Sequence, residues 1–134
     1  MKQFETIRYP TVFESTAVLM HRKCRDELKS ILERSGKKAK FAAQFNIRLQ
    51  FLVQNGANAV KHRQWFEVLL KERGISAIRF INIDNIRILY ILRDKTAFLL
   101  HAFKETSSAT SNDPNSYRHA IEIAEKRIED IEGA

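Results

Sequence analysis

The sequence predicts an α+β fold in which a helical hairpin packs on a small antiparallel β-sheet, within a single domain over residues 1–134. Two observations lead to this expectation. In the first half of the chain, apolar residues recur every three or four positions, as on one face of an amphipathic helix. After Gly74 the chain becomes rich in β-branched and aromatic residues, in runs separated by turn-forming pairs, which is typical of an antiparallel meander. The expected element order is β-α-α-(α)-β-β-β-α.

The first elements are predicted from local signals near the N-terminus. Residues 3–9 form a plausible short strand that Pro10 closes, because proline cannot donate to a strand ladder. Ser15 can cap a helix that runs to about Arg34, since serine favours the N-cap position. A short basic turn then leads to the second helix of the hairpin.

The second helix carries the clearest periodic signal, over residues 37–56. Its apolar stripe consists of Phe41, Phe45, Leu49 and Leu52. Asn55-Gly56 ends this helix, because glycine readily adopts the backbone conformation of a helix C-cap. Residues 58–74 are ambiguous: their apolar spacing permits a short helix, which Gly74 would close.

The second half of the chain is predicted to form a three-stranded meander, a loop and a helix. The expected strands cover residues 75–83, 86–92 and 97–103, with Asp84-Asn85 and Asp94-Lys95 as the turns between them. Residues 107–116 are expected to form a polar loop. The final helix is expected over residues 117–131, with Ile121, Ala124 and Ile128 on one face.

Cationic side chains interrupt the apolar strands of this meander, and their positions depend on the strand register, because side chains alternate between the two faces of a strand. If each hairpin loop holds an odd number of residues, one face carries Arg79, Arg87, Arg93 and His101. The opposite face then carries Ile78, Phe80, Ile88, Leu100 and Ala102, which suits contact with helices. A loop one residue shorter would scatter the cationic residues. Each of them is either a solvated or hydrogen-bonded side chain, or part of a site that faces an open concavity.

The chain has a net charge of +7, from 23 Lys and Arg residues and 16 Asp and Glu residues. Acidic residues gather in the C-terminal helix, so the body up to Lys104 is more basic than the average. This balance favours a polyanionic partner, such as nucleic acid or an acidic protein.

The expected location is the cytoplasm. The one cysteine, Cys24, cannot form an intramolecular disulfide, which favours a reducing compartment. The N-terminal residues lack the apolar core of a signal peptide, and no stretch reaches the roughly 18 apolar residues of a membrane span. No membrane partner is therefore expected.

The common nucleotide-binding and metal-binding motifs do not occur in the chain. There is no glycine-rich phosphate or dinucleotide loop and no H-E-x-x-H pair. The four histidines and the cysteine lack the spacing of metal ligands, so we expect no metal and no small-molecule cofactor. Any chemistry would be metal-free and built from cationic side chains.

The stretch "IRILYILRDKTAFLLHAFKET", followed by a polar loop and the helix "SYRHAIEIAEKRIEDI", resembles the C-terminal half of the RelE/ParE toxin superfamily. It is most similar to the HigB-like, phage-derived branch, whose members carry an R-I-x-Y strand, a turn and an L-L-H-x-F-x-K strand. Residues 75–130 carry the detailed similarity. Residues 1–60 match only in architecture, as the start of the β-α-α-β-β-β plan of the superfamily.

The resemblance implies the toxin of a type II toxin–antitoxin system, a ribonuclease that cuts messenger RNA in the ribosomal A site and is inhibited by a cognate antitoxin protein. Metal-free cleavage of RNA requires the 2′-hydroxyl to attack the adjacent phosphate. A base must take that proton, cations must hold the developing charge, and an acid must protonate the leaving 5′-oxygen.

The resemblance also assigns roles to individual residues. The catalytic residues that it implies are Arg87, His101, Lys104 and Tyr117, and further contacts to RNA phosphates are expected from Arg79, Arg93 and Lys95. Arginine grips a phosphate with two hydrogen bonds, lysine supplies a point charge, and histidine can transfer protons near neutral pH. The chain departs from the pattern at Glu105, where many members have a second lysine, and at Ser76 and Ala77, where some have catalytic lysines.

Two alternatives stand beside the ribonuclease. One is a ParE-like protein that poisons DNA gyrase by contact, without catalysis. The other is a degenerate, non-toxic binding module of mobile-element origin. The expected partners of the ribonuclease are messenger RNA on the ribosome and an antitoxin segment that lies in a groove and covers the basic face.

Overall fold

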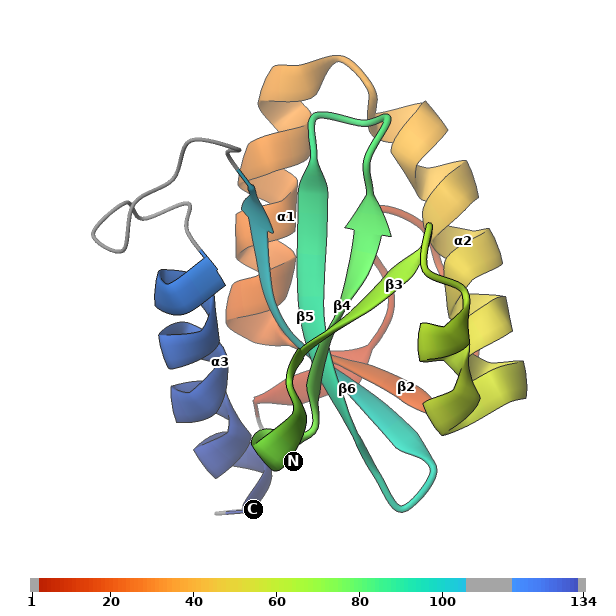
Figure 1. Cartoon of the computed structure of the whole chain (residues 1–134). Coiled ribbons are helices and arrows are strands. Elements are labelled where there is room, and N and C mark those ends of the chain that lie inside the picture. Colours follow the sequence, from red (N-terminus) through yellow and green to blue (C-terminus); the bar gives the residue numbers. More distant parts are fainter. Residues whose placement is uncertain (1–2, 106–116, 133–134) are drawn as a thin grey trace.

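A six-stranded mixed sheet forms the centre of the computed structural model, which describes residues 3–105 and 117–132 (Figure 1). The strands are β1 (Phe4–Thr6), β2 (Val18–His21), β3 (Phe66–Leu70), β4 (Ile75–Phe80), β5 (Ile86–Arg93) and β6 (Thr96–Lys104). The helices are α1 (Arg22–Ser35), α2 (Lys38–Asn55) and α3 (Tyr117–Glu132), with short 3₁₀ turns η1 (Gly56–Lys61) and η2 (Lys71–Arg73). The predicted α+β class is confirmed, and no helix in the described part of the chain is long and apolar enough to cross a membrane.

The sheet is larger than predicted and is not purely antiparallel. Its strand order is β1-β2-β6-β5-β4-β3, so the expected meander β4-β5-β6 is present and forms the middle. β2 pairs with β6 in parallel, and this pairing makes the sheet mixed. β1 and β3 extend the two edges by antiparallel pairing. The predicted loop over 107–116 lies outside the described residues.

The prediction of a helix from Ser15 is wrong for its first turns, because Val18–His21 form strand β2 and α1 begins only at Arg22. The side chains of Val18 and Met20 are buried, and β2 gains its backbone partners from β6. His21 takes the capping role instead, since its Nδ1 accepts a hydrogen bond from the Lys23 N–H at 3.1 Å.

The ambiguous segment 58–74 does not form an α-helix. Its middle, Phe66–Leu70, is β3, which pairs antiparallel with β4. Phe66 is 1% exposed and contacts the core, so burial of this ring and a strand partner override the weak helical spacing. Gly74 closes the segment at φ 71° and Gly56 ends α2 at φ 53°, as their backbone freedom suggests.

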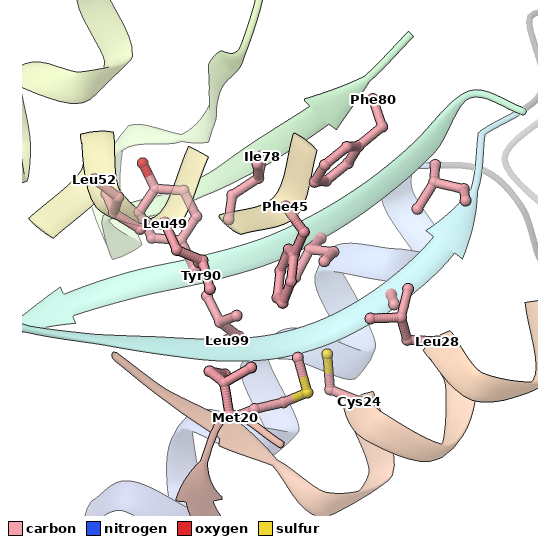
Figure 2. Packing of buried hydrophobic residues seen from close by; sticks show 14 of the residues in the cluster. Met20, Cys24, Leu28, Phe45, Leu49, Leu52, Ile78, Phe80, Tyr90 and Leu99 are labelled. Atoms are coloured by element: carbon pink, nitrogen blue, oxygen red, sulfur yellow. The ribbon is translucent and has the colours of Figure 1, made fainter. Parts of the chain in front are cut away.

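The two faces of the sheet are covered by different helices (Figure 1). On one face, Phe45, Leu49 and Leu52 of α2 pack against Ile78 and Tyr90 in the larger apolar cluster (Figure 2). Met20, Cys24 and Leu28 from β2 and α1 complete this cluster. On the other face, Ala120, Ala124 and Ile128 of α3 cover a second cluster that includes Ala77 and Leu89.

The register of the meander depends on a β-bulge. The β4–β5 loop holds an odd number of residues, as a shared cationic face requires, because β4 ends at Phe80, which pairs with Ile86, and the turn is longer than the expected pair Asp84-Asn85. The β5–β6 loop holds only Asp94 and Lys95, both at positive φ, so this loop is even. With regular pairing after this two-residue loop, His101 would lie on the opposite face of the sheet from Arg87.

The bulge in β6 restores the shared face. Tyr90 pairs with Leu99, but the preceding Leu89 pairs with His101, which leaves Leu100 unpaired. Arg87 and His101 therefore project from the same face of the sheet, the one that α3 covers. The expectation that Leu100 lies on the opposite face is wrong: the two-residue loop pairs Phe98 with Ile91, so Phe98 and Leu100 both lie in the cluster beneath α3.

Candidate functional site

Arg87 lies at the centre of a polar network between the sheet and the first residue of α3. Its Nε donates a hydrogen bond to the Tyr117 hydroxyl at 2.8 Å, and that hydroxyl donates to Glu67 Oε1 at 2.9 Å. The Glu105 carboxylate lies 4.0 Å from Arg87 Nη2. Arg87 is only 4% exposed. The expectation that Arg87 faces an open concavity is therefore wrong: α3 covers it.

Arg79 pairs directly with Arg87 across the β4–β5 ladder. Two like charges in this arrangement repel each other unless counter-charges lie close. Glu67 supplies one, because its carboxylate lies 4.0 Å from Arg79 Nε while it accepts the bond from Tyr117. Arg79 Nη1 donates to the backbone carbonyl of Arg63 at 2.6 Å. The two arginines are thus held by protein groups.

Tyr117 closes this network as a neutral phenol. Burial raises the pKa of its hydroxyl above the ordinary value of 10.0, the Arg87 guanidinium opposes that rise, and Glu67 adds to it. The hydroxyl therefore keeps its proton near neutral pH and donates a hydrogen bond to Glu67. In this conformation Tyr117 anchors α3 to the sheet.

His101 forms a second polar group with side chains of two helices. Its Nδ1 lies 2.9 Å from Glu27 Oε1, on α1. Arg127, on α3, donates to both carboxylate oxygens of Glu27 at 2.8 Å and to the carbonyl of Leu100. Burial alone would raise the pKa of Glu27, but the hydrogen bonds from His101 and Arg127 bring it below its ordinary value. Glu27 is thus a carboxylate.

The Glu27 carboxylate determines which nitrogen of the His101 ring donates a hydrogen bond. A carboxylate only accepts hydrogen bonds, so Nδ1 must carry the proton that it donates. Among the described residues, no polar atom bonds the other ring nitrogen, Nε2, although that atom is buried. His101 as a whole is 5% exposed. A buried imidazole with one nitrogen held by a carboxylate and the other without a partner is unusual in a structural role.

Glu27 also accepts a hydrogen bond from a backbone N–H of β6 that has no strand partner. β2 accompanies β6 only along Ala97–Leu99, after which the chain of β2 turns into α1. Beyond that point the Ala102 N–H has no strand partner on this side, and Glu27 Oε1 accepts it at 3.2 Å. A local structural role for Glu27 therefore coexists with its contact to His101.

A pocket of about 700 Å³ lies between α1, the end of β6 and the start of α3. Its lining includes His101, Lys104 and His119. Lys104 and His119 are exposed, whereas His101 is buried in the wall. The volume is within the range of small-ligand sites, which run from about 300 to 1,000 Å³.

Three carboxylates also line this pocket, and each has a cationic neighbour. Glu27 is paired with Arg127. Asp26 lies 3.1 Å from Arg25 Nη2. Glu105 is the residue that lies 4.0 Å from Arg87. These pairings reduce the repulsion that an anionic ligand would meet in the pocket.

The predicted site residues thus fall into three places. His101 and Lys104 share the pocket, while Arg79, Arg87 and Tyr117 belong to the network beneath α3. Arg93 shares the strand face of Arg87 but lies six residues along β5, about 20 Å away for an extended strand. Lys95, in the next turn, lines a separate pocket beside the end of α2. The structure does not bring Arg93 and Lys95 to the other five residues.

Three residues of this region are not among the predicted site residues: Glu27, Arg127 and His119. The contact of Glu27 with His101 joins residues 74 positions apart, and the contact with Arg127 joins residues 100 positions apart. Helical periodicity places Glu27 on a polar face and carries no signal for either pairing. His119 is visible in the sequence only as one of four histidines without ligand spacing.

Comparisons with protein-family models, with curated proteins and with solved structures find no match to this chain. Support for a function therefore comes from the contacts described above and from the resemblance in residues 75–130.

Proposed function

We propose that this chain is the toxin of a type II toxin–antitoxin pair, a RelE/HigB-like protein that cuts messenger RNA on the ribosome without a metal ion. The observation that carries the proposal is the imidazole of His101, held by Glu27 and placed with Lys104 on one pocket of nucleotide size. These are two of the four residues to which the sequence resemblance assigns catalysis.

The topology supports the same family. From β2 the chain runs through the hairpin α1–α2 and, after β3, into the meander β4-β5-β6. β6 returns to lie parallel with β2. Strand, helical hairpin and meander in this order correspond to the β-α-α-β-β-β plan that the resemblance implies, with β1 and β3 as additions at the edges.

The pocket supplies two of the groups that the chemistry needs. With Nδ1 protonated and bound to Glu27, Nε2 of His101 carries the lone pair that can accept the 2′-hydroxyl proton. Lys104 places an ammonium charge where negative charge develops on the phosphate. Because Nε2 is covered in the described conformation, the wall of the pocket must shift before a ribose reaches it.

Arg87 and Tyr117 take a different part in this proposal from the one that the resemblance assigns. Their hydrogen bond holds α3 over the sheet, so neither contacts RNA while α3 stays in place. The phosphate contact is therefore assigned to Lys104. A cognate antitoxin remains the proposed protein partner, since an acidic or amphipathic segment is attracted to a chain of net charge +7.

The test is a translation assay with purified ribosomes and an end-labelled message. The wild-type protein is expected to produce new 5′-hydroxyl ends within codons, and His101→Gln is expected to abolish them. Lys71→Ala, which removes an exposed lysine from η2, serves as the matched control for surface charge. An intact message in the presence of folded wild-type protein would overturn the proposal.

A non-catalytic function is the second candidate, and a specific observation favours it. Arg87, which the resemblance places at the centre of catalysis, is buried and hydrogen-bonded to protein groups, as purely structural residues are. A ParE-like inhibitor of gyrase would block DNA supercoiling in vitro, and a non-toxic binding module would leave cell growth unchanged. In either case His101→Gln would alter stability only.

A further inference from the structure

We infer that His119 is the general acid of the pocket and acts with His101 as a pair of proton-transferring histidines on one RNA phosphate. This inference rests on the proposed ribonuclease function and completes it, because His101 and Lys104 leave the protonation of the departing 5′-oxygen without a donor.

His119 reaches the pocket from the first turn of α3. Within that turn Ala120 packs into the apolar cluster, Tyr117 is half-buried against the sheet, and His119 is exposed. Ile123, four residues later, lines the same pocket. Residues four apart share one side of a helix, so α3 presents His119 and Ile123 together toward the cavity between itself and α1.

The two histidines differ in their surroundings, and the difference assigns their roles. His101 is buried and holds its Nδ1 proton against Glu27, whose counter-charge Arg127 already supplies. With the Nδ1 proton held by Glu27, Nε2 is the ring nitrogen that can accept a proton, as a base must. His119 is exposed to solvent, so its imidazole can meet the departing oxygen and pass a proton to it, as an acid must.

The reaction balances with these groups alone. The 2′-oxygen attacks the phosphorus and forms a P–O2′ bond, while its proton passes to His101 Nε2. The P–O5′ bond breaks, and the electron pair remains on O5′, which takes a proton from the His119 imidazolium. The products are a 2′,3′-cyclic phosphate and a 5′-hydroxyl end, and one proton has moved from His119 to His101 overall. Lys104 stabilises the charge on the phosphate oxygens during the transfer.

A substrate with a bridging sulfur in place of O5′ tests the role of His119, because a thiolate leaves without a proton. On an ordinary message, His119→Asn is expected to slow cleavage by about 10²- to 10⁴-fold, the usual contribution of a positioned acid. On the sulfur-substituted message, His119→Asn should cleave at the wild-type rate, whereas His101→Gln should stay defective on both. Lys126→Ala, at an exposed position of the same helix, is the control for surface effects.

The outcomes separate this inference from the proposed function. Wild-type protein that cuts neither message overturns the ribonuclease itself. Wild-type cleavage together with an unimpaired His119→Asn variant, or with an equal loss on both messages, overturns only the assignment of His119.

A binding measurement gives an independent readout. Titration with uridine 3′-monophosphate, followed by NMR of the imidazole nitrogens, is expected to shift the signals of His101 and His119 together. His62, which stacks on Trp65 and does not line the pocket, is expected to stay unchanged. A titration that moves only one of the two histidines would contradict a shared phosphate site.

Discussion

Arg87 and Tyr117 join the middle of the sheet to the start of α3 through a hydrogen bond of 2.8 Å between Nε and the phenol oxygen. The same hydroxyl donates to Glu67, so one oxygen links two strands with the helix. This bond holds beneath a helix the arginine to which the sequence resemblance assigned a phosphate contact. The first prediction therefore concerns the hydrogen bond by which Tyr117 anchors α3 to the sheet.

Tyr117→Phe is expected to destabilise the protein by about 1–3 kcal/mol, because it leaves Arg87 Nε and Glu67 without their partner. Urea unfolding measures this loss, and amide hydrogen exchange should show it concentrated in α3. Tyr9→Phe is the matched control, since the Tyr9 hydroxyl is buried without a hydrogen-bond partner among the described residues. If the two variants were equally stable, Tyr117 would not be an anchor.

Glu27→Ala is expected to change the proton position on His101. In the wild-type protein the imidazole ¹⁵N shifts should report a proton on Nδ1, because the Glu27 carboxylate accepts from that atom. Without the carboxylate, the ring should populate the tautomer with its proton on Nε2. Glu33→Ala, at an exposed position of α1, should leave the His101 signals unchanged. Identical His101 spectra in both variants would remove Glu27 as a positioning residue.

The free energy of unfolding is expected to fall on the acid side through Glu27. Because its folded-state pKa lies below the ordinary value of 4.5, the carboxylate contributes stability that is fully present above that value. The contribution is lost as the pH falls through the folded-state pKa. The stability difference between wild type and Glu27→Gln should therefore shrink as the pH falls below the ordinary value of 4.5. A difference that stays constant as the pH falls below that value would contradict the lowered pKa.

Lys104→Ala and Lys95→Ala are expected to differ sharply in the ribosome assay. Lys104 lines the pocket with His101, so its removal should reduce cleavage by about 10²-fold, as for the loss of one charge-stabilising group. Lys95 lies in the turn after β5 and lines another pocket, so its variant should cleave at nearly the wild-type rate. Equal losses would show that general positive charge, and not the pocket, determines activity.

Local patterns were sufficient to predict the elements that depend on neighbours in the chain. The helix over 38–55 follows from the spacing of Phe41, Phe45, Leu49 and Leu52, and all four side chains are buried. The turn at Asp94 and Lys95 follows from Asp94, a residue type that tolerates positive φ. The final helix was predicted in the same way from Ala124 and Ile128, which are also buried.

The same patterns could not reveal the structure that depends on distant pairing. Val18–His21 is a strand because β6, almost eighty residues later, supplies its partner. The cationic residues of the meander were expected to lie on one face only if both hairpin loops held an odd number of residues. The β5–β6 loop holds two residues, an even number, and the unpaired residue Leu100 in the β6 bulge returns His101 to the face of Arg87. Alternation along a strand cannot reveal a bulge, since the bulge arises from how two strands pair.

The amino-acid sequence by itself determined the fold class, helix α2 and the meander, because each depends on periodicity over a few neighbouring positions. It also fixed the set of cationic and titratable residues available for chemistry. Only the tertiary structure decided which of these residues meet. Packing of α3 on the sheet buries Arg87. The bulge in β6 places His101 on the same face of the sheet as Arg87, and α1 brings the Glu27 carboxylate to His101 Nδ1. The physical reason is that the two helix contacts join residues 30 and 74 positions apart, and the bulge arises from the pairing of two strands, so all three depend on the packing of the chain.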